Sequence, residues 1–185
     1  MKKLVIGITG MDSLENPYPG PAIARCLKEQ GQDIVEHIKA VTYEPLTTGI
    51  YCHDSVDSVY LVPYPADSEN MLLASYRELQ KKSPIDFLIP ALDSEIAVYA
   101  RLSKQLEQIG IKTLLPSESA VKARSKISLA YTCNRLNIPT PQLEVLNHED
   151  QIDQLRDNFS FPIYVKGSII EAEKADNVDE AKYHY

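Results

Sequence analysis

The sequence has 185 residues, of which 44% are hydrophobic and 24% charged, the proportions of an ordinary globular protein. A chain of this length can bury a core without disulfide bonds, and it suits one domain with part of a second. The formal net charge of −7 argues against a nucleic-acid-binding surface, which requires clustered Lys and Arg. No apolar run approaches the length of a membrane span.

The cysteines are Cys26, Cys52 and Cys133, which are far apart and lack the Cys-x-x-Cys spacing of zinc and redox sites. We therefore expect no disulfide framework and no metal site. Glycines interrupt the apolar run near the N-terminus too early for a signal peptide, which favours a reducing, cytoplasmic setting. Cys26 falls on the apolar face of a predicted helix and is expected to pack as a small hydrophobic residue.

Strands and helices are expected to alternate over residues 1–116. Short apolar runs predict buried strands at residues 3–9, 34–41, 57–62, 86–90 and 112–115. Helices are predicted from Pro21 to Gly31, from Ser68 to Lys82 with Leu72, Leu73, Tyr76 and Leu79 facing inward, and from Ser94 to Ile109. This alternation predicts an α/β fold with an open, doubly wound, mostly parallel sheet covered on both faces.

After Pro116 the pattern changes. Ser125 is placed to cap a helix from Lys126 to Leu136, and an extended, proline-rich linker follows up to Pro141. Beyond it we expect strands at 143–146, 161–167 and 169–172 and helices at 148–158 and 178–182. The predicted parts are a domain at 1–116, a helical linker at 117–141 and a piece at 142–185. That piece has too few apolar residues for a core of its own.

Two loops at the carboxyl ends of predicted strands are candidate substrate sites. The first contains Gly10 and Asp12. A glycine turn before a helix N-terminus can bind an anion through backbone N–H groups, and Asp12 can face a substrate amine. The second contains Asp93 and Glu95, at the edge where open α/β sheets bind ligands. Each has a simpler alternative, because Gly10 can serve only the turn, and Asp93 and Glu95 can serve only the helix N-terminus.

Two lysines are candidate phosphate ligands. Lys126 stands at the beginning of a helix, where a cation opposes the helix dipole and a bound phosphate would compensate for it. Lys166 interrupts an apolar strand, so its charge must reach solvent or an anion. A solvated lysine is the alternative at both positions.

Taken together, four segments resemble the ATP-grasp superfamily in order and spacing, and most closely the branch of the carbamoyl-phosphate synthase large subunit. The segments are residues 3–27 with the glycine turn, residues 87–95 (Phe-Leu-Ile-Pro-Ala-Leu-Asp-Ser-Glu), residues 125–141, which end in Ile-Pro-Thr-Pro, and residues 161–167 (Phe-Pro-Ile-Tyr-Val-Lys-Gly). The resemblance implies a Rossmann-like pre-ATP-grasp domain followed by the beginning of an ATP-grasp subdomain. It also implies that Lys126 and Lys166 contact ATP phosphates. Ser125 departs from the family, which usually has an acidic residue there.

The resemblance implies an ATP-dependent carboxylate–amine ligase, which activates a carboxylate as an acyl phosphate and transfers it to an amine. The adenine-binding and Mg²⁺-binding segments of the family would lie beyond Tyr185. We therefore expect an N-terminal fragment that has no catalytic residue, binds neither ATP nor Mg²⁺ and is inactive alone.

Two alternatives stay open. One is a Rossmann-type nucleotide-binding domain, which the absence of G-x-G-x-x-G disfavours. The other is a non-catalytic scaffold or interaction module. The strand near residues 163–165 leaves an open edge, so the piece at 142–185 is expected either to be mobile or to pair with the same piece of a second molecule. The apolar edge favours the homodimer.

Overall fold

The computed structural model describes residues 2–13, 17–167 and 172–185. The chain divides into two compact units, Met1–Glu118 and Ser119–Tyr185. The finer division into 1–116, 117–141 and 142–185 stays a prediction. Among the described residues, no helix is both long enough and apolar enough to cross a membrane.

The first unit is built on a five-stranded parallel sheet with the order β3-β2-β1-β4-β5. The strands are β1 (Leu4–Ile8), β2 (Val35–Thr42), β3 (Ser58–Leu61), β4 (Phe87–Ile89) and β5 (Lys112–Thr113). The helices are α1 (Pro19–Gln30), the 3₁₀ helix η1 (Thr48–Tyr51), α2 (Glu69–Lys82) and α3 (Asp93–Gln108). The chain winds from β1 outward to β3 and then crosses to β4, so its direction reverses between β1 and β4. The predicted doubly wound α/β fold is confirmed.

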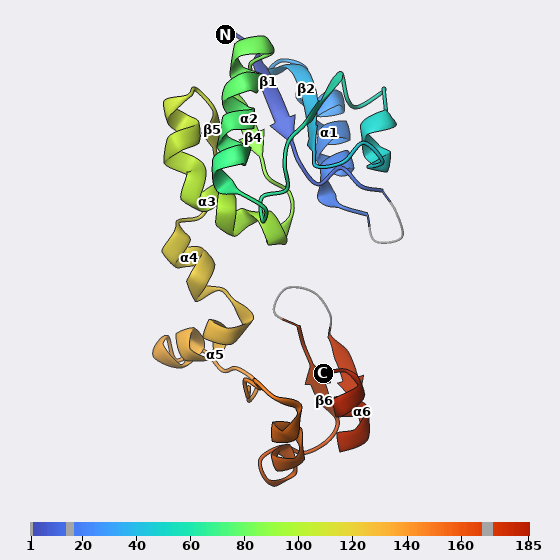
Figure 1. The fold of residues 1–185 in the computed structure, drawn as a ribbon, viewed down its shortest axis with the longest axis vertical. Coiled ribbons are helices and arrows are strands. Elements are labelled where there is room, and N and C mark those ends of the chain that lie inside the picture. Colours follow the sequence, from blue (N-terminus) through green and yellow to red (C-terminus); the bar gives the residue numbers. More distant parts are fainter. Residues whose placement is uncertain (1, 14–16, 168–171) are drawn as a thin grey trace. The chain divides into compact units, whose positions relative to one another are not determined.

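Helices cover both faces of this sheet (Figure 1). On one face lie α2 and α3, and the four apolar side chains predicted to face inward from α2 are all buried. On the other face lies α1. Ile38 and Ala40 of β2 belong to the core beneath α1, whereas Val41 belongs to the core beneath α2 and α3, because successive strand residues point to opposite faces.

Cys26 is exposed, so the prediction that it packs against the core is wrong. The buried residues of α1 are Gly20 and Ala24, and Ile23 and Leu27 pack beside them. Cys26 follows Ala24 by two positions, which places it about 200° further round the helix. Its side chain therefore points away from the sheet.

Two aspartates clamp the strands at the amino edge of the sheet. Each precedes a strand, and its carboxylate accepts a backbone N–H from the neighbouring strand. Asp57 accepts the N–H of Ile38 at 2.7 Å, and Asp86 accepts the N–H of Val5 at 2.8 Å. The bond from Val5 holds the pKa of Asp86 below its ordinary value.

The second unit has a small core of its own, so the prediction that residues 142–185 lack one is wrong. Its elements are α4 (Glu118–Ala123), α5 (Lys126–Arg135), the 3₁₀ helix η2 (Glu149–Asp157), β6 (Ile163–Val165), β7 (Glu173–Ala175) and α6 (Val178–Tyr183). The strands β6 and β7 pair in antiparallel orientation. The core forms because η2, the strand pair and α6 each direct a few apolar side chains to one place: Ile152, Leu155, Ala175, Val178 and Ala181.

Local predictions for this unit differ from the structure in several places. Residues 143–146 form no strand, and Leu143 and Val145 are exposed, because no strand in the described ranges pairs with them. The helix predicted at 148–158 is the 3₁₀ helix η2. The strand predicted at 169–172 falls mostly on residues 168–171, which lie outside the described residues.

Gly49→Ala is expected to destabilise the first unit. The N–H of Gly49 donates to the carbonyl oxygen of Met11 at 2.8 Å, and a Cβ at Gly49 would lie 2.1 Å from that oxygen. The backbone must shift to relieve this overlap, so we expect the free energy of unfolding to fall by about 2 kcal/mol. Urea unfolding followed by circular dichroism measures the change. An unchanged unfolding midpoint would contradict this description of the loop after β1.

Candidate functional site

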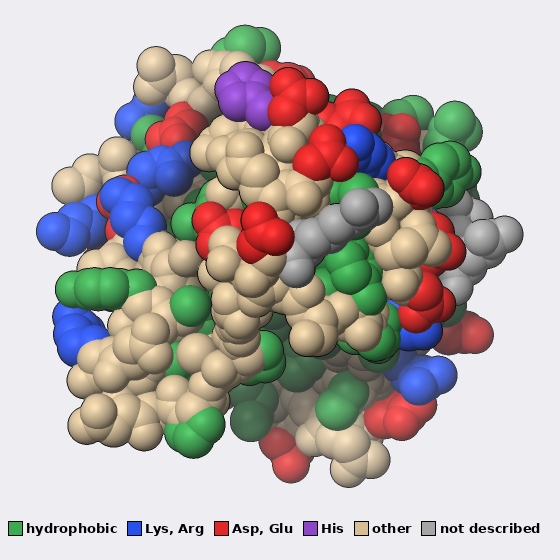
Figure 2. Space-filling view, turned by 90° about the horizontal axis from the view of Figure 1, so that it is seen from below, with side chains coloured by type: hydrophobic (Ala, Val, Ile, Leu, Met, Phe, Trp, Pro, Cys, Tyr) green, Lys and Arg blue, Asp and Glu red, His purple; other side chains and the backbone are tan. Residues whose placement is uncertain are grey.

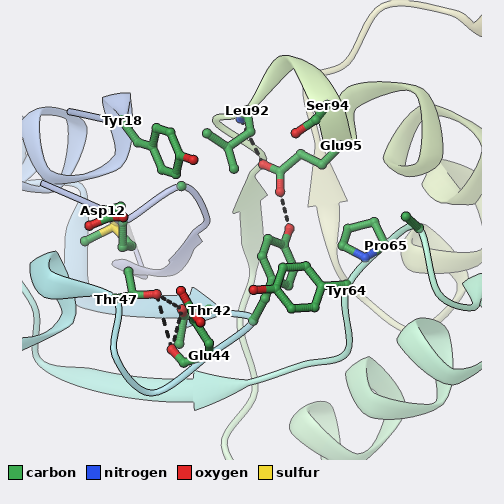
Figure 3. A pocket seen from close by; sticks show the side chains of 14 residues that line it. Asp12, Tyr18, Thr42, Glu44, Thr47, Tyr64, Pro65, Leu92, Ser94 and Glu95 are labelled. Carbon is green, nitrogen blue, oxygen red and sulfur yellow. Dashed lines mark hydrogen bonds between the residues drawn. The ribbon is translucent and has the colours of Figure 1, made fainter. Parts of the chain in front are cut away.

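A pocket of about 310 Å³ lies at the carboxyl edge of the sheet in the first unit. Its walls come from the segments that follow β1, β2, β3 and β4, together with Tyr18 just before α1 (Figure 3). These segments meet where the winding reverses between β1 and β4, the position at which open α/β sheets bind ligands. The pocket is lined by Gly10, Met11, Asp12, Tyr18, Thr42, Tyr43, Glu44, Thr47, Tyr64, Pro65, Ala66, Leu92, Ser94 and Glu95.

Glu95 joins three strand ends at this pocket. It is 2% exposed, and its carboxylate accepts hydrogen bonds from the hydroxyls of Thr9, after β1, and Tyr43, after β2. It also accepts the N–H groups of Ala91 and Leu92, after β4, at 2.8 and 3.0 Å. Figure 3 draws the bond to the tyrosine hydroxyl as a dashed line. Burial raises the pKa of Glu95 above its ordinary value, although the bonds from Thr9 and Tyr43 oppose the shift.

The contacts of Glu95 continue into the core through tyrosine hydroxyls. The hydroxyl oxygens of Tyr43 and Tyr99 are 3.3 Å apart, and those of Tyr99 and Tyr76 are 2.7 Å apart. Tyr76 and Tyr99 are fully buried, and burial raises the pKa of both, so their hydroxyls stay protonated. Because both oxygens of Glu95 already accept hydrogen bonds, this carboxylate acts first as a structural link in the wall of the pocket.

The structure places three of the four predicted substrate-binding residues in the pocket wall, namely Gly10, Asp12 and Glu95. Gly10 has a φ of +61°, a conformation that favours glycine. Asp93 is not among the described lining residues. It is exposed and begins α3, where a carboxylate favours the helix dipole.

The carboxylate of Asp12 is held in place by its neighbour Ser13 and by Thr48, the first residue of η1. Its Oδ1 accepts hydrogen bonds from the N–H of Ser13 and the hydroxyl of Thr48, both at 2.8 Å. The same Thr48 oxygen accepts the N–H of Ser13 at 2.9 Å. This arrangement fixes one acidic group in the wall on the β1 side.

The remaining lining includes aromatic and acidic side chains that sequence reasoning missed, namely Tyr18, Tyr43, Tyr64 and Glu44. The rings of Tyr43 and Tyr64 stack with centroids 5.2 Å apart. Burial, together with the negative charges of Glu44 and Asp67, raises the pKa of Tyr64. The sequence could have pointed to these residues through their place after predicted strands. Tyr43 and Glu44 follow β2 and Tyr64 follows β3, just as Asp12 follows β1. Among the described lining residues none is Lys, Arg or His.

The helix N-termini beside the pocket have few donors for an anion. Pro19 and Pro21 of α1 have no N–H, and the N–H of Gly20 donates to the carbonyl oxygen of Gly10 at 3.0 Å. At the start of α3, the Glu95 carboxylate already accepts the two N–H groups before the helix. The geometry therefore does not support the interpretation of the glycine turn as an anion site.

In the second unit the amino group of Lys126 lies against the backbone of the residue that follows Lys166. Ser125 caps α5 as predicted, accepting the N–H of Ser128 at 3.2 Å. Nζ of Lys126 donates to the carbonyl oxygen of Gly167 at 2.8 Å. Gly167 follows Lys166, which is exposed just after β6. The fold thus brings Lys126 beside the backbone at Lys166, although the two are far apart in the sequence.

No group of three or more His, Cys, Asp or Glu within residues 2–13, 17–167 and 172–185 is placed to hold a metal ion.

Comparison with solved structures identifies the fold. The chain is similar to the L-amino acid ligase from Bacillus licheniformis, with 14% identity, a TM-score of 0.67 and coverage of 99% of this chain and 41% of the ligase. It is also similar to N5-carboxyaminoimidazole synthetase from Staphylococcus aureus, with 14% identity, a TM-score of 0.61 and coverage of 99% of this chain and 44% of the synthetase. No family model matches the sequence.

A third similar structure is the biotin carboxylase domain dimer of the 2-oxoglutarate carboxylase from Hydrogenobacter thermophilus, solved in complex with MgADP, ADP and bicarbonate. Identity is 14%, the TM-score is 0.60, and the match covers 98% of this chain and 39% of that one. The chain thus spans less than half the length of each of these proteins. It has the fold of ATP-grasp enzymes: a Rossmann-like doubly wound sheet followed by the beginning of an ATP-grasp subdomain.

Glu95→Gln tests the structural role of the buried carboxylate. The amide can accept from Thr9 and the two N–H groups and can donate to Tyr43, so the fold should persist. The pKa of Glu95 lies above its ordinary value of 4.5 in the folded chain, so wild-type stability falls as pH rises from 4.5 through the folded pKa. We expect the stability of the Gln variant relative to wild type to increase over that range.

Glu95→Ala is the contrasting variant, because it removes the acceptor of the Thr9 and Tyr43 hydroxyls and of the Leu92 N–H, while the N–H of Ala91 keeps Oγ1 of Thr9 at 2.9 Å. We expect it to lower the free energy of unfolding by about 3 kcal/mol. Urea titrations at several pH values measure both effects. A pH-independent difference between Gln and wild type would contradict the raised pKa.

Proposed function

We propose that these 185 residues form the N-terminal part of an ATP-dependent carboxylate–amine ligase of the carbamoyl-phosphate synthase-like branch. The observation that carries the proposal is the bond from Lys126 to the carbonyl of Gly167, which puts two lysine positions beside one another in the second unit. The similarity in fold to a ligase and a synthetase supports it.

In this proposal the two units have separate roles. The first unit presents a substrate at the pocket lined by Gly10, Asp12 and Glu95. In the second, Lys126 and Lys166 contact the phosphates of ATP, as cations at a phosphate site do. ATP supplies the phosphoryl group that activates the carboxylate. Other residues of the proposed ligase, outside these 185, would supply the Mg²⁺ ligands and the adenine contacts.

This proposal is preferred to a Rossmann-type dinucleotide-binding domain. Such a domain receives a pyrophosphate on the N-terminus of the helix after β1. In this chain that turn of α1 contains Pro19 and Pro21, and the N–H of Gly20 is already bonded. Titration with nicotinamide cofactors tests the alternative. Saturable binding of such a cofactor, at a site where ATP does not compete, would favour the dinucleotide-binding domain.

Loss of either lysine should weaken the use of ATP. We expect Lys126→Ala and Lys166→Ala each to lower kcat/KM for ATP about tenfold or more, because each removes a charged hydrogen-bond donor. The assay is carboxylate- and amine-dependent release of phosphate from ATP by the protein that the complete reading frame encodes. Lys122→Ala, the same charge change on α4, is the control. Equal effects of all three variants would contradict the assignment.

The 185-residue chain alone should release no phosphate from ATP, because it spans less than half the length of the ligase and of the synthetase whose fold it shares. Malachite-green detection of phosphate over several hours measures this. Turnover that persists through purification and disappears in Lys166→Ala would show that the chain holds a complete site.

We also propose that the second unit self-associates. The pair β6–β7 leaves the outer edge of β6 without a strand partner among the described residues, and Tyr164 on β6 is exposed. Helix α5 has no buried residue and exposes Ile127 and Tyr131. The face drawn in Figure 2 carries hydrophobic side chains among acidic and basic ones.

Sedimentation velocity over a range of protein concentrations tests this association. We expect a dimer, and we expect Tyr164→Lys to shift it towards monomer, because a lysine on an edge strand opposes pairing with a second strand. Tyr51→Lys, at an exposed tyrosine of the first unit, is the control. A wild-type chain that stays monomeric at every concentration would overturn the proposal.

A further inference from the structure

The lining of the pocket in the first unit has a chemistry that selects one class of ligand. We infer that the pocket binds the protonated amino group of an aliphatic amine and excludes carboxylates and phosphates. This inference rests on the proposed function, in which an amine accepts the activated carboxylate, and it specifies the acceptor as one whose amino group stands apart from any carboxylate.

The first argument is the sign of the charge. Asp12 and Glu44 place carboxylates in the lining, and no Lys, Arg or His joins them among the described lining residues. Asp12 is fixed by the Ser13 N–H and the Thr48 hydroxyl, so its position does not depend on a ligand. A cation entering the pocket is attracted and an anion is repelled.

The second argument is the aromatic wall. Tyr43 and Tyr64 stack against each other, and Tyr18 lies across the space from Tyr64 (Figure 3). The faces of tyrosine rings attract ammonium groups through their quadrupole. Leu92 and Pro65 add apolar surface that suits the alkyl chain of an amine. The space of about 310 Å³ is at the lower end of small-molecule sites, which suits a short aliphatic ligand.

The third argument is that several of the usual donors for an anion are absent or already bonded. A loop between a strand and a helix normally offers backbone N–H groups and the positive end of the helix. Here the first turn of α1 has prolines at 19 and 21, and the N–H of Gly20 is bonded to the loop. The N–H groups before α3 are bonded to the buried carboxylate of Glu95. An α-amino acid would bring a carboxylate for which the described lining offers no cation.

The test compares ligands that share one carbon chain and differ in charge. We would titrate the 185-residue chain at pH 7 with n-butylammonium, n-butanol and butyrate, without ATP, and follow backbone amides by NMR. We expect n-butylammonium to shift the amides of residues 10–12, 43–47 and 64–66 saturably, with an affinity that weakens as salt is added. Its affinity should exceed that of n-butanol about tenfold, and butyrate should not bind.

Matched variants assign the binding to the lining. Glu44→Gln should weaken binding of n-butylammonium about tenfold, and Asp33→Asn, the same charge change on an exposed loop at the opposite edge of the sheet, should not. Tyr64→Leu should weaken binding, whereas Tyr64→Phe, which keeps the ring, should preserve it. Amide spectra of each free variant check that the fold is intact.

Butyrate or inorganic phosphate binding as tightly as n-butylammonium would overturn the inference, and so would the absence of any saturable shift with n-butylammonium. Equal affinities of Glu44→Gln and Asp33→Asn would overturn it as well. The outcome is separable from that of the proposed function, because these titrations use no ATP. If the pocket binds the amine but the complete protein releases no phosphate from ATP, the inference stands and the proposed ligase function is contradicted. If the complete protein condenses its substrates with ATP but this pocket binds no amine, the ligase function stands and the inference is contradicted.

Discussion

The buried carboxylate of Glu95 is the contact on which the geometry of the first unit depends. It accepts from Thr9 after β1, from Tyr43 after β2 and from two N–H groups after β4, and thereby fixes the strand ends that form the pocket. A charge buried to this extent is tolerated only because hydrogen bonds replace the water it loses. The tyrosine hydroxyls behind it extend the same network into the core.

The same contact changes which groups the pocket offers to a ligand. The carboxylate of Glu95 accepts the two N–H groups that precede α3, and prolines remove donors from the start of α1. The fold places a cavity where α/β proteins bind ligands, and the side chains decide the charge of its lining. The fold therefore indicates where a ligand binds, and the side chains of the site indicate which kind of ligand fits.

The second unit shows how few apolar residues are enough to form a core. Ile152, Leu155 and Val178 belong to a core built from short elements. In this unit Lys126, far from Lys166 in the sequence, donates to the carbonyl that follows Lys166. The pairing is a property of the folded unit, because neither lysine stands out from a solvated residue by its local sequence alone.

The sequence by itself determined the alternation of strands and helices, the inward face of α2 and the cap at Ser125, because each depends on periodicity or on a hydrogen bond within a few residues. It also placed Gly10, Asp12 and Glu95 at the carboxyl edge of the sheet. Only the tertiary structure decided that Cys26 is exposed, that residues 143–146 have no partner strand in the part of the chain that is described, and that Tyr43, Glu44 and Tyr64 complete the pocket. The physical reason is that burial, strand pairing and the charge of a cavity depend on which segments meet in space, and the contacts that set them join residues far apart along the chain.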